Sequence, residues 1–186
     1  MLKLKDRLNR NYTDINKMKK NNLVGIVLLA IGMASCGPNQ NQAIKYNDSV
    51  ISIIDGVNIN QNLFMNQLDG HNIDSLKITH TLFAAKTKAS LENLSKVKPF
   101  EGKNELGNTA TALFTMLNNF TAGDAKQMVE LLTKDSTMYT QQDDDKVQEL
   151  AKKFDDEYSI AYDKLDKAQK EFSKEWKFDL IKEDNK

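Results

Sequence analysis

Residues 143–178, DDDKVQELAKKFDDEYSIAYDKLDKAQKEFSKEWKF, decide the fold. Apolar side chains recur here at steps of three and four, at Val147, Ala151, Phe154, Tyr158, Ala161, Leu165, Ala168, Phe172 and Trp176. This is the period of an α-helix that buries one face. Aspartates stand at the beginning of the stretch, and Lys174 and Lys177 stand near its end, as the helix dipole favours. The stretch therefore predicts one long helix that needs partner helices to cover its apolar face.

Three further stretches have the same period, and strand-like alternation is absent. From about residue 42 to 68 the expected stripe is Ala43, Tyr46, Val50, Ile53, Val57 and Phe64, broadened by Ile54, Gln61 and Leu68. From about residue 73 to 97 it is Ile73, Leu76, His80, Phe83, Thr87, Leu91, Leu94 and Val97. A third helix begins near Asn104, with the stripe Leu106, Ala110, Leu113, Leu117 and Phe120. We expect residues 121–124 to kink this last helix before it continues past Met128.

The connections between these stretches are short. Residues 69–72 (DGHN) are typical of a turn. Residues 98–102 (KPFEG) combine a proline that ends a helix with a glycine that permits a reversal. We therefore predict an all-α protein: an antiparallel up-down-up-down four-helix bundle with long helices over residues 42–180, followed by a polar tail at 181–186.

The stretch before the bundle has a different character. A basic start at residues 18–22 (MKKNN) is followed by an apolar run over residues 23–34 and then by Cys36, the only cysteine. An apolar run of this length suits the core of a signal peptide and is too short to span a bilayer as a stable helix. Residues 37–42 (GPNQNQ) are polar, as expected of a tether.

The sequence Met33-Ala34-Ser35-Cys36 resembles the lipobox of bacterial lipoproteins. The resemblance implies cleavage between Ser35 and Cys36, a diacylglycerol on the Cys36 thiol, and a fatty acyl chain such as palmitate on the new amino group. Residues 1–35 are then a signal peptide, with Met18 as the expected start of translation, and residues 36–41 a lipidated tether. The alternatives are a buried free cysteine on an ordinary helix, an uncleaved anchor, and a long basic leader that begins at Met1.

Two segments of the bundle also resemble uncharacterised helical-bundle lipoproteins of Gram-negative bacteria. They are residues 43–47 (AIKYN) and the corner at residues 98–102. That family implies a helical bundle in the cell envelope and supplies no catalytic residues. Gly37 follows Cys36, where the enterobacterial sorting rule associates an aspartate with inner-membrane retention. The resemblance therefore favours the outer membrane, and we expect a periplasm-facing orientation.

The composition excludes one class of partner. Beyond Ser35 the chain carries 19 basic and 24 acidic residues, and all the basic ones are lysines because both arginines, Arg7 and Arg10, come earlier. Arginine is the side chain best suited to bidentate recognition of phosphates and bases. We therefore expect no nucleic-acid partner.

Candidate catalytic and metal-binding residues are few. His71 and His80 are the only histidines, and neither Glu-x-x-His nor His-Glu-x-x-His occurs. We expect His80 to be a satisfied histidine at the edge of the core. Residues 143–145 lack the ligand spacing of a calcium loop, so we interpret them as a solvated helix start, and residues 155–157 as exposed surface. We accordingly predict no metal, no cofactor and no catalytic residues.

The function expected from these patterns is non-enzymatic. The leading hypothesis is a lipid-anchored envelope protein, a helical bundle that binds or spaces an envelope partner. The alternative is a module that binds a small apolar ligand between helices near Trp176 or His80, where Tyr158, Tyr162 and Phe172 could line one end of a groove. A hydrolase with an unrecognised site is the third hypothesis, although glycine-rich nucleophile and phosphate motifs are missing.

Overall fold

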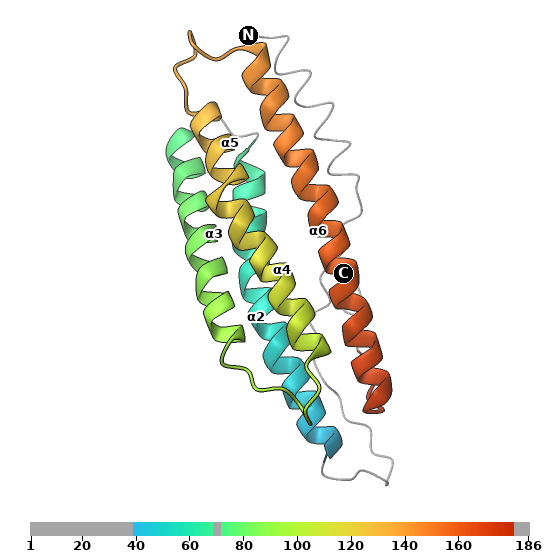
Figure 1. Ribbon diagram of the computed structural model, residues 1–186. Coiled ribbons are helices and arrows are strands. Elements are labelled where there is room, and N and C mark those ends of the chain that lie inside the picture. Colours follow the sequence, from blue (N-terminus) through green and yellow to red (C-terminus); the bar gives the residue numbers. More distant parts are fainter. Residues whose placement is uncertain (1–38, 69–71, 181–186) are drawn as a thin grey trace, which may run out of the picture.

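A computed structural model describes residues 39–68 and 72–180 of the chain (Figure 1). These residues form the helices α2 (Asn39–Gln67), α3 (Ile73–Leu94), α4 (Glu105–Ala122), α5 (Asp124–Leu132) and α6 (Gln141–Glu175). Within these ranges no strand is present beyond an isolated bridge between Phe100 and Lys103. The prediction of an all-α helical bundle is confirmed.

The chain runs up the bundle in α2, down in α3, up through α4 and α5, and down again in α6 (Figure 1). We call one end of the bundle the basal end, which comprises residues 39–48, 95–104 and 170–180. The opposite end is the distal end, which comprises residues 59–68, 72–81 and 123–150. The start of α2 and the last turns of α6 therefore lie together, at the basal end.

The kink expected at residues 121–124 is a break between two helices. Gly123 has φ −111° and ψ −90°, outside the helical region, and separates α4 from α5. Its N–H still donates to the carbonyl of Asn119, so α4 is closed by a normal helical hydrogen bond. Asp124 then stands in the first turn of α5, where the helix dipole favours a negative charge.

The buried face of α2 differs in part from the predicted one. Two rows of side chains face the core, spaced alternately by four and three residues: Ala43, Asn47, Val50, Ile54, Val57, Gln61, Phe64 and Leu68. The row of Ala43, Val50, Val57 and Phe64 was predicted correctly, and Ile54, Gln61 and Leu68 were predicted to broaden it. Ile53 is only half-buried, whereas Asn47 is fully buried and was missed. Asn47 was missed because a hydrophobic pattern does not mark an amide as part of the core.

Phenylalanine rings connect the helices in the distal half of the core. Phe64 of α2 lies 5.9 Å from Phe83 of α3 and 6.4 Å from Phe120 of α4, measured between ring centroids. Phe120 in turn stacks on Phe154 of α6 at 4.0 Å. Aromatic pairs at such distances add to the stabilisation that comes from burying their area. This cluster joins all four long helices.

The seam between α2 and α6 is wider than the other helix contacts and contains buried polar pairs. The backbones of these two helices lie further apart than those of the other neighbouring pairs, so long side chains bridge them. Gln169 Nε2 donates to Asn47 Oδ1 at 3.1 Å in a buried hydrogen bond, and the Gln61 side chain bonds the Tyr158 hydroxyl. Buried polar pairs of this kind fix the register of two helices.

We predict that Phe64→Ala lowers the free energy of unfolding by about 3–5 kcal/mol, because the ring is fully buried and its removal leaves a cavity. Leu63→Ala is the matched control: Leu63 is 45% exposed, so the loss should stay within about 1 kcal/mol. Urea unfolding followed by far-UV circular dichroism measures both values. Equal losses in the two variants would contradict the placement of Phe64 at the centre of the core.

Candidate functional site

The predicted modification site lies outside the described residues. These exclude Cys36, the predicted cleavage site at Ser35–Cys36, and His71. The structure does correct the predicted tether, because α2 begins at Asn39 and residues 39–41 are helical. The polar run after Cys36 therefore contributes only Gly37 and Pro38 before the helix.

An aromatic cluster closes the basal end of the bundle, beside the start of α2. Phe100, from the α3–α4 connection, lies 4.8 Å from Trp176, 5.6 Å from Tyr46 and 5.8 Å from Phe172 between ring centroids. Phe178, which follows α6, lies 6.0 Å from Phe172. Tyr46, Phe172 and Phe178 are buried, and Phe100 and Trp176 are half-buried. Of the four rings predicted to line a ligand groove, Phe172 and Trp176 therefore pack in this cluster, whereas Tyr158 and Tyr162 stack on each other further along α6.

A tight turn brings Phe100 into this cluster. Phe100 and Lys103 exchange two backbone hydrogen bonds of 2.9 and 3.0 Å. The two residues between them have positive φ angles, 50° at Glu101 and 75° at Gly102, a conformation that favours glycine. The corner predicted at residues 98–102 thus reverses the chain and also holds an aromatic ring over the end of the core.

Tyr46 links this cluster to α4. Its hydroxyl donates to Asn104 Oδ1 at 3.2 Å and accepts a hydrogen bond from the backbone of Gly107. A Cβ atom at Gly107 would lie 2.9 Å from the Tyr46 hydroxyl, so only glycine allows this close approach. The start of α2 is in this way anchored to the start of α4.

His80 occupies the satisfied position that was predicted. It is half-buried, and its Nε2 atom donates to the carbonyl of Thr121 at 2.9 Å. Thr121 lies in the last turn of α4, where carbonyl groups lack intrahelical partners. The ring also packs 5.7 Å from Phe64. His80 therefore stabilises the end of α4 and packs against the core, and these two contacts account for its position.

The acidic start of α6 is only partly the solvated helix start that was predicted. Asp143 forms a capping box with Thr140 and pairs with Lys134 at 2.7 Å. Asp144, however, is 1% exposed, and its carboxylate accepts hydrogen bonds from the side chains of Tyr139, Gln141 and Gln148. The prediction of exposure is wrong for Asp144, because three neutral donors and the helix N-terminus replace its water.

The residues of the second acidic run, 155–157, also differ in their exposure to solvent. Asp156 and Glu157 are exposed as predicted, whereas Asp155 is half-buried and its Oδ2 atom has no hydrogen-bond partner in the described part of the chain. Burial raises the pKa of Asp155 above its ordinary value, and the neighbouring charge of Asp156 adds to that shift. Asp155 thus faces inward on a helix whose neighbouring acidic residues face water.

A hollow of about 570 Å³ lies along the side of α4 that faces α6, and no sequence pattern pointed to it. On α4 the lining includes the small side chains of Thr111, Ala112 and Thr115 beside the larger ones of Met116 and Phe120. The longer side chains of Lys153 and Glu157 rise from α6 on the other side. The hollow is partly open to solvent and lies between two helices, so it is a groove. We call it the α4–α6 groove.

The lining of the α4–α6 groove combines apolar side chains, among them Ala112, Met116 and Phe120, with hydroxyl, amide and charged groups. Thr111 and Thr115 donate their hydroxyl protons to carbonyls one turn earlier, which leaves their oxygens free to accept. Asn108 accepts from Asn104 through Oδ1, so its amide nitrogen remains a donor. Lys153 pairs with Asp124 at 2.8 Å at one end. The groove therefore offers hydrogen-bond donors and acceptors with little net charge.

The described residues contain neither a metal-binding group nor a membrane-spanning helix. Over residues 39–68 and 72–180, no three histidine, cysteine or acidic side chains are grouped so that they could bind a metal ion. In the same ranges no helix has the length and the apolar character needed to cross a membrane.

Tyr158 gives the seam between α2 and α6 a pH dependence. Its burial, with the neighbouring Tyr162, raises the pKa of its hydroxyl to about 12, while an unfolded tyrosine ionises near 10. The contribution of this hydroxyl to the free energy of unfolding is therefore fully present below pH 10. It is lost between pH 10 and 12, because the unfolded chain releases this proton first. We predict that Tyr158→Phe makes this decline shallower by on the order of 2 kcal/mol.

Urea unfolding at a series of alkaline pH values, followed by Trp176 fluorescence, measures the decline. Ser159→Ala, a change at the exposed neighbouring position, is the control and should keep the wild-type dependence. An unchanged decline in Tyr158→Phe would contradict the burial of this hydroxyl.

The chain was compared with protein-family models, with curated proteins and with solved structures, and no match was found. Two features of the described chain bear on function: the basal end, where α2 begins three residues after Cys36 in the sequence, and the α4–α6 groove.

Proposed function

We propose that the protein is a lipid-anchored, non-enzymatic component of a bacterial cell envelope, held through Cys36 in the outer membrane. In this proposal the helical bundle binds or spaces an envelope partner. The observation that carries it is the position of the only cysteine: it ends a short apolar run with the lipobox pattern and stands three residues before the first described helix.

The chemistry of the bundle supports a non-enzymatic role. Three inward-facing polar groups that could be catalytic candidates have structural partners. His80 bonds a helix-end carbonyl, Asp144 accepts from three neutral side chains, and Asn47 bonds Gln169. General acid–base catalysis needs a titratable group within reach of a substrate in an open site. In the α4–α6 groove Lys153 lies 2.8 Å from Asp124 and 4.0 Å from Glu157, so the titratable side chains there are ion-paired.

The anchor is tested in a Gram-negative host with labelled palmitate. The wild-type protein should take up the label, fractionate with the outer membrane, and yield an N-terminal peptide that begins with Cys36 carrying a diacylglycerol on its thiol and an acyl chain on its amino group. Cys36→Ala should lose the label entirely and keep its leader. A second variant, Cys36→Ala with Ser159→Cys, moves the thiol to an exposed position on α6 and should also remain unlabelled.

An unmodified Cys36 thiol on a chain with an intact N-terminus would overturn the proposal. So would label that follows the thiol to residue 159, because acylation would then be nonspecific.

A second candidate function is a small-ligand-binding module, which the α4–α6 groove favours. Its volume of about 570 Å³ lies in the usual range for ligand sites. The lining of hydroxyls and amides suits a neutral ligand rich in hydroxyl and amide groups, such as an N-acetylated sugar. The apolar ligand expected near Trp176 or His80 is not favoured, because aromatic rings and a helix-end hydrogen bond occupy those places.

Native mass spectrometry with chitotriose as the probe tests this second candidate. A one-to-one complex is expected for the wild type and should be lost in Thr115→Trp, whose indole fills the groove. Thr81→Trp, at an exposed position on α3, is the control and should retain the complex. Equal binding by both variants, or none by the wild type, would count against a sugar site in the groove.

A further inference from the structure

We infer that the basal end of the bundle is a membrane-facing surface that contacts anionic lipid headgroups, so that the bundle stands on the bilayer and its distal end points away. This inference rests on the proposed acylation of Cys36. It concerns which surface of the described bundle meets the lipid.

The chain between the proposed lipid attachment at Cys36 and the start of α2 is short. Asn39 is already helical, so only Gly37 and Pro38 separate it from Cys36. Three residues of fully extended chain span about 11 Å at most. An anchor at Cys36 therefore holds the start of α2 within about 11 Å of the acylated residue, whatever conformation the spacer takes. A tether this short brings the basal end down to the headgroup layer.

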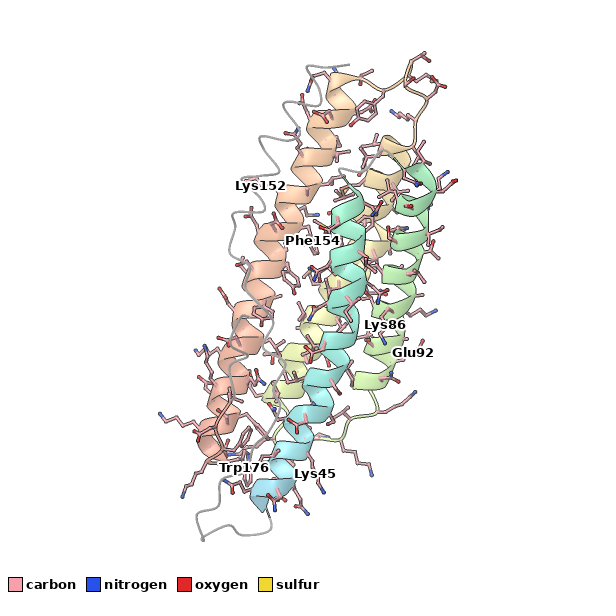
Figure 2. All side chains as sticks on the ribbon, turned by 180° about the vertical axis from the view of Figure 1, so that it is seen from behind. Lys45, Lys86, Glu92, Lys152, Phe154 and Trp176 are labelled. Atoms are coloured by element: carbon pink, nitrogen blue, oxygen red, sulfur yellow. The ribbon has the colours of Figure 1, made fainter. Side chains whose placement is uncertain are left out.

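The α3–α4 connection and the end of α6 pack against the start of α2. The Gln40 side chain donates to the carbonyl of Lys177 at 2.5 Å. Tyr46 packs on Phe100 and Phe172, and Lys103 pairs with Glu175. Figure 2 shows Lys45 and Trp176 at this end of the bundle, while Phe154 and Lys152 lie toward the other. Whatever holds the start of α2 at a surface also brings the α3–α4 corner and the end of α6 to it.

Charge is distributed unevenly along the bundle, with an excess of lysines at the basal end and of carboxylates at the distal end. The basal end carries seven lysines and five acidic residues, whereas the distal end carries four lysines and eight acidic residues. An anionic membrane surface attracts lysines close to it and repels carboxylates. The polarity of the bundle therefore matches an orientation in which the basal end faces the lipid.

Most of the basal lysines are unpaired, although Lys103 and Lys170 pair with carboxylates. At the distal end three of the four lysines pair with carboxylates: Lys126, Lys134 and Lys146. Five exposed basal lysines form no ion pair within the described ranges: Lys45, Lys96, Lys98, Lys174 and Lys177. An unpaired ammonium on a flexible stem can reach a lipid phosphate, and the aromatic cluster behind it suits the interface between water and lipid.

The single tryptophan makes the orientation measurable. The full-length protein, recovered with its acyl chains, is reconstituted into vesicles of phosphatidylcholine with or without phosphatidylglycerol, and headgroup-labelled nitroxide lipids serve as quencher. Trp176 should be quenched. A double variant, Trp176→Phe with Met138→Trp, moves the reporter to an exposed distal residue, roughly 50 Å away along α6, and should not be quenched.

Charge is tested with two matched quadruple variants. Replacement of Lys96, Lys98, Lys174 and Lys177 by Gln should lower the extra quenching caused by phosphatidylglycerol about twofold or more. The control replaces four exposed lysines outside the basal end, which are also unpaired in the described chain: Lys77, Lys86, Lys88 and Lys164. It removes the same total charge and should leave the quenching unchanged.

The inference fails if the distal tryptophan is quenched as strongly as Trp176, since the bundle would then lie flat, or if phosphatidylglycerol has no effect on the wild type. Failure of the anchor itself is recognised separately, because the mass of the Cys36 peptide is measured on the same preparation. If that thiol is free, coupling it to a maleimide lipid places the anchor at the same atom, and the quenching test of the basal end proceeds unchanged.

Discussion

The packing of Phe120 is the contact on which the rest of the bundle depends. Its ring lies between Phe64 of α2 and Phe154 of α6, and it also meets Phe83 of α3. The backbones of α2 and α6 stay too far apart for close contact along their seam, so α6 is held to the bundle mainly through α4 and α5. The last turn of α4, where Phe120 stands, is completed by the hydrogen bond from His80 to Thr121. One buried ring and one helix-end hydrogen bond thus organise the distal half of the core.

Much of this architecture could be predicted from periodicity. The apolar stripes of α4 and α6 are half-buried or buried at each predicted position, because both helices use apolar side chains at nearly every inward place. In α2 the same reasoning missed Asn47 and placed Gln61 only at the edge of the apolar stripe. Both side chains occupy core positions, although a hydrophobic pattern counts amides as surface. Their burial depends on Gln169 and Tyr158, which lie about a hundred residues away in the sequence.

The candidate sites were harder to predict for the same reason. The burial of Asp144 depends on how Tyr139 folds back over the first turn of α6, and three consecutive aspartates give no sign of which one faces inward. The α4–α6 groove arises from threonine and alanine side chains that are shorter than their neighbours on the facing helix. Short polar residues on a helix surface look alike in a sequence whether or not a hollow lies above them.

The seam between α2 and α6 also has a consequence for the order of folding. The hairpins α2–α3 and α3–α4 join neighbours in the sequence, so their loop-closure entropy is small. The hydrogen bond from Gln169 to Asn47 spans 122 residues, and the buried ring pair of Tyr46 and Phe172 spans a similar separation. Contacts of such separation form late, after local helix pairs have already collapsed. The bundle therefore becomes a closed structure only when its last helix returns to its first, and the start of α2 stays partly uncovered until synthesis of the chain is nearly complete.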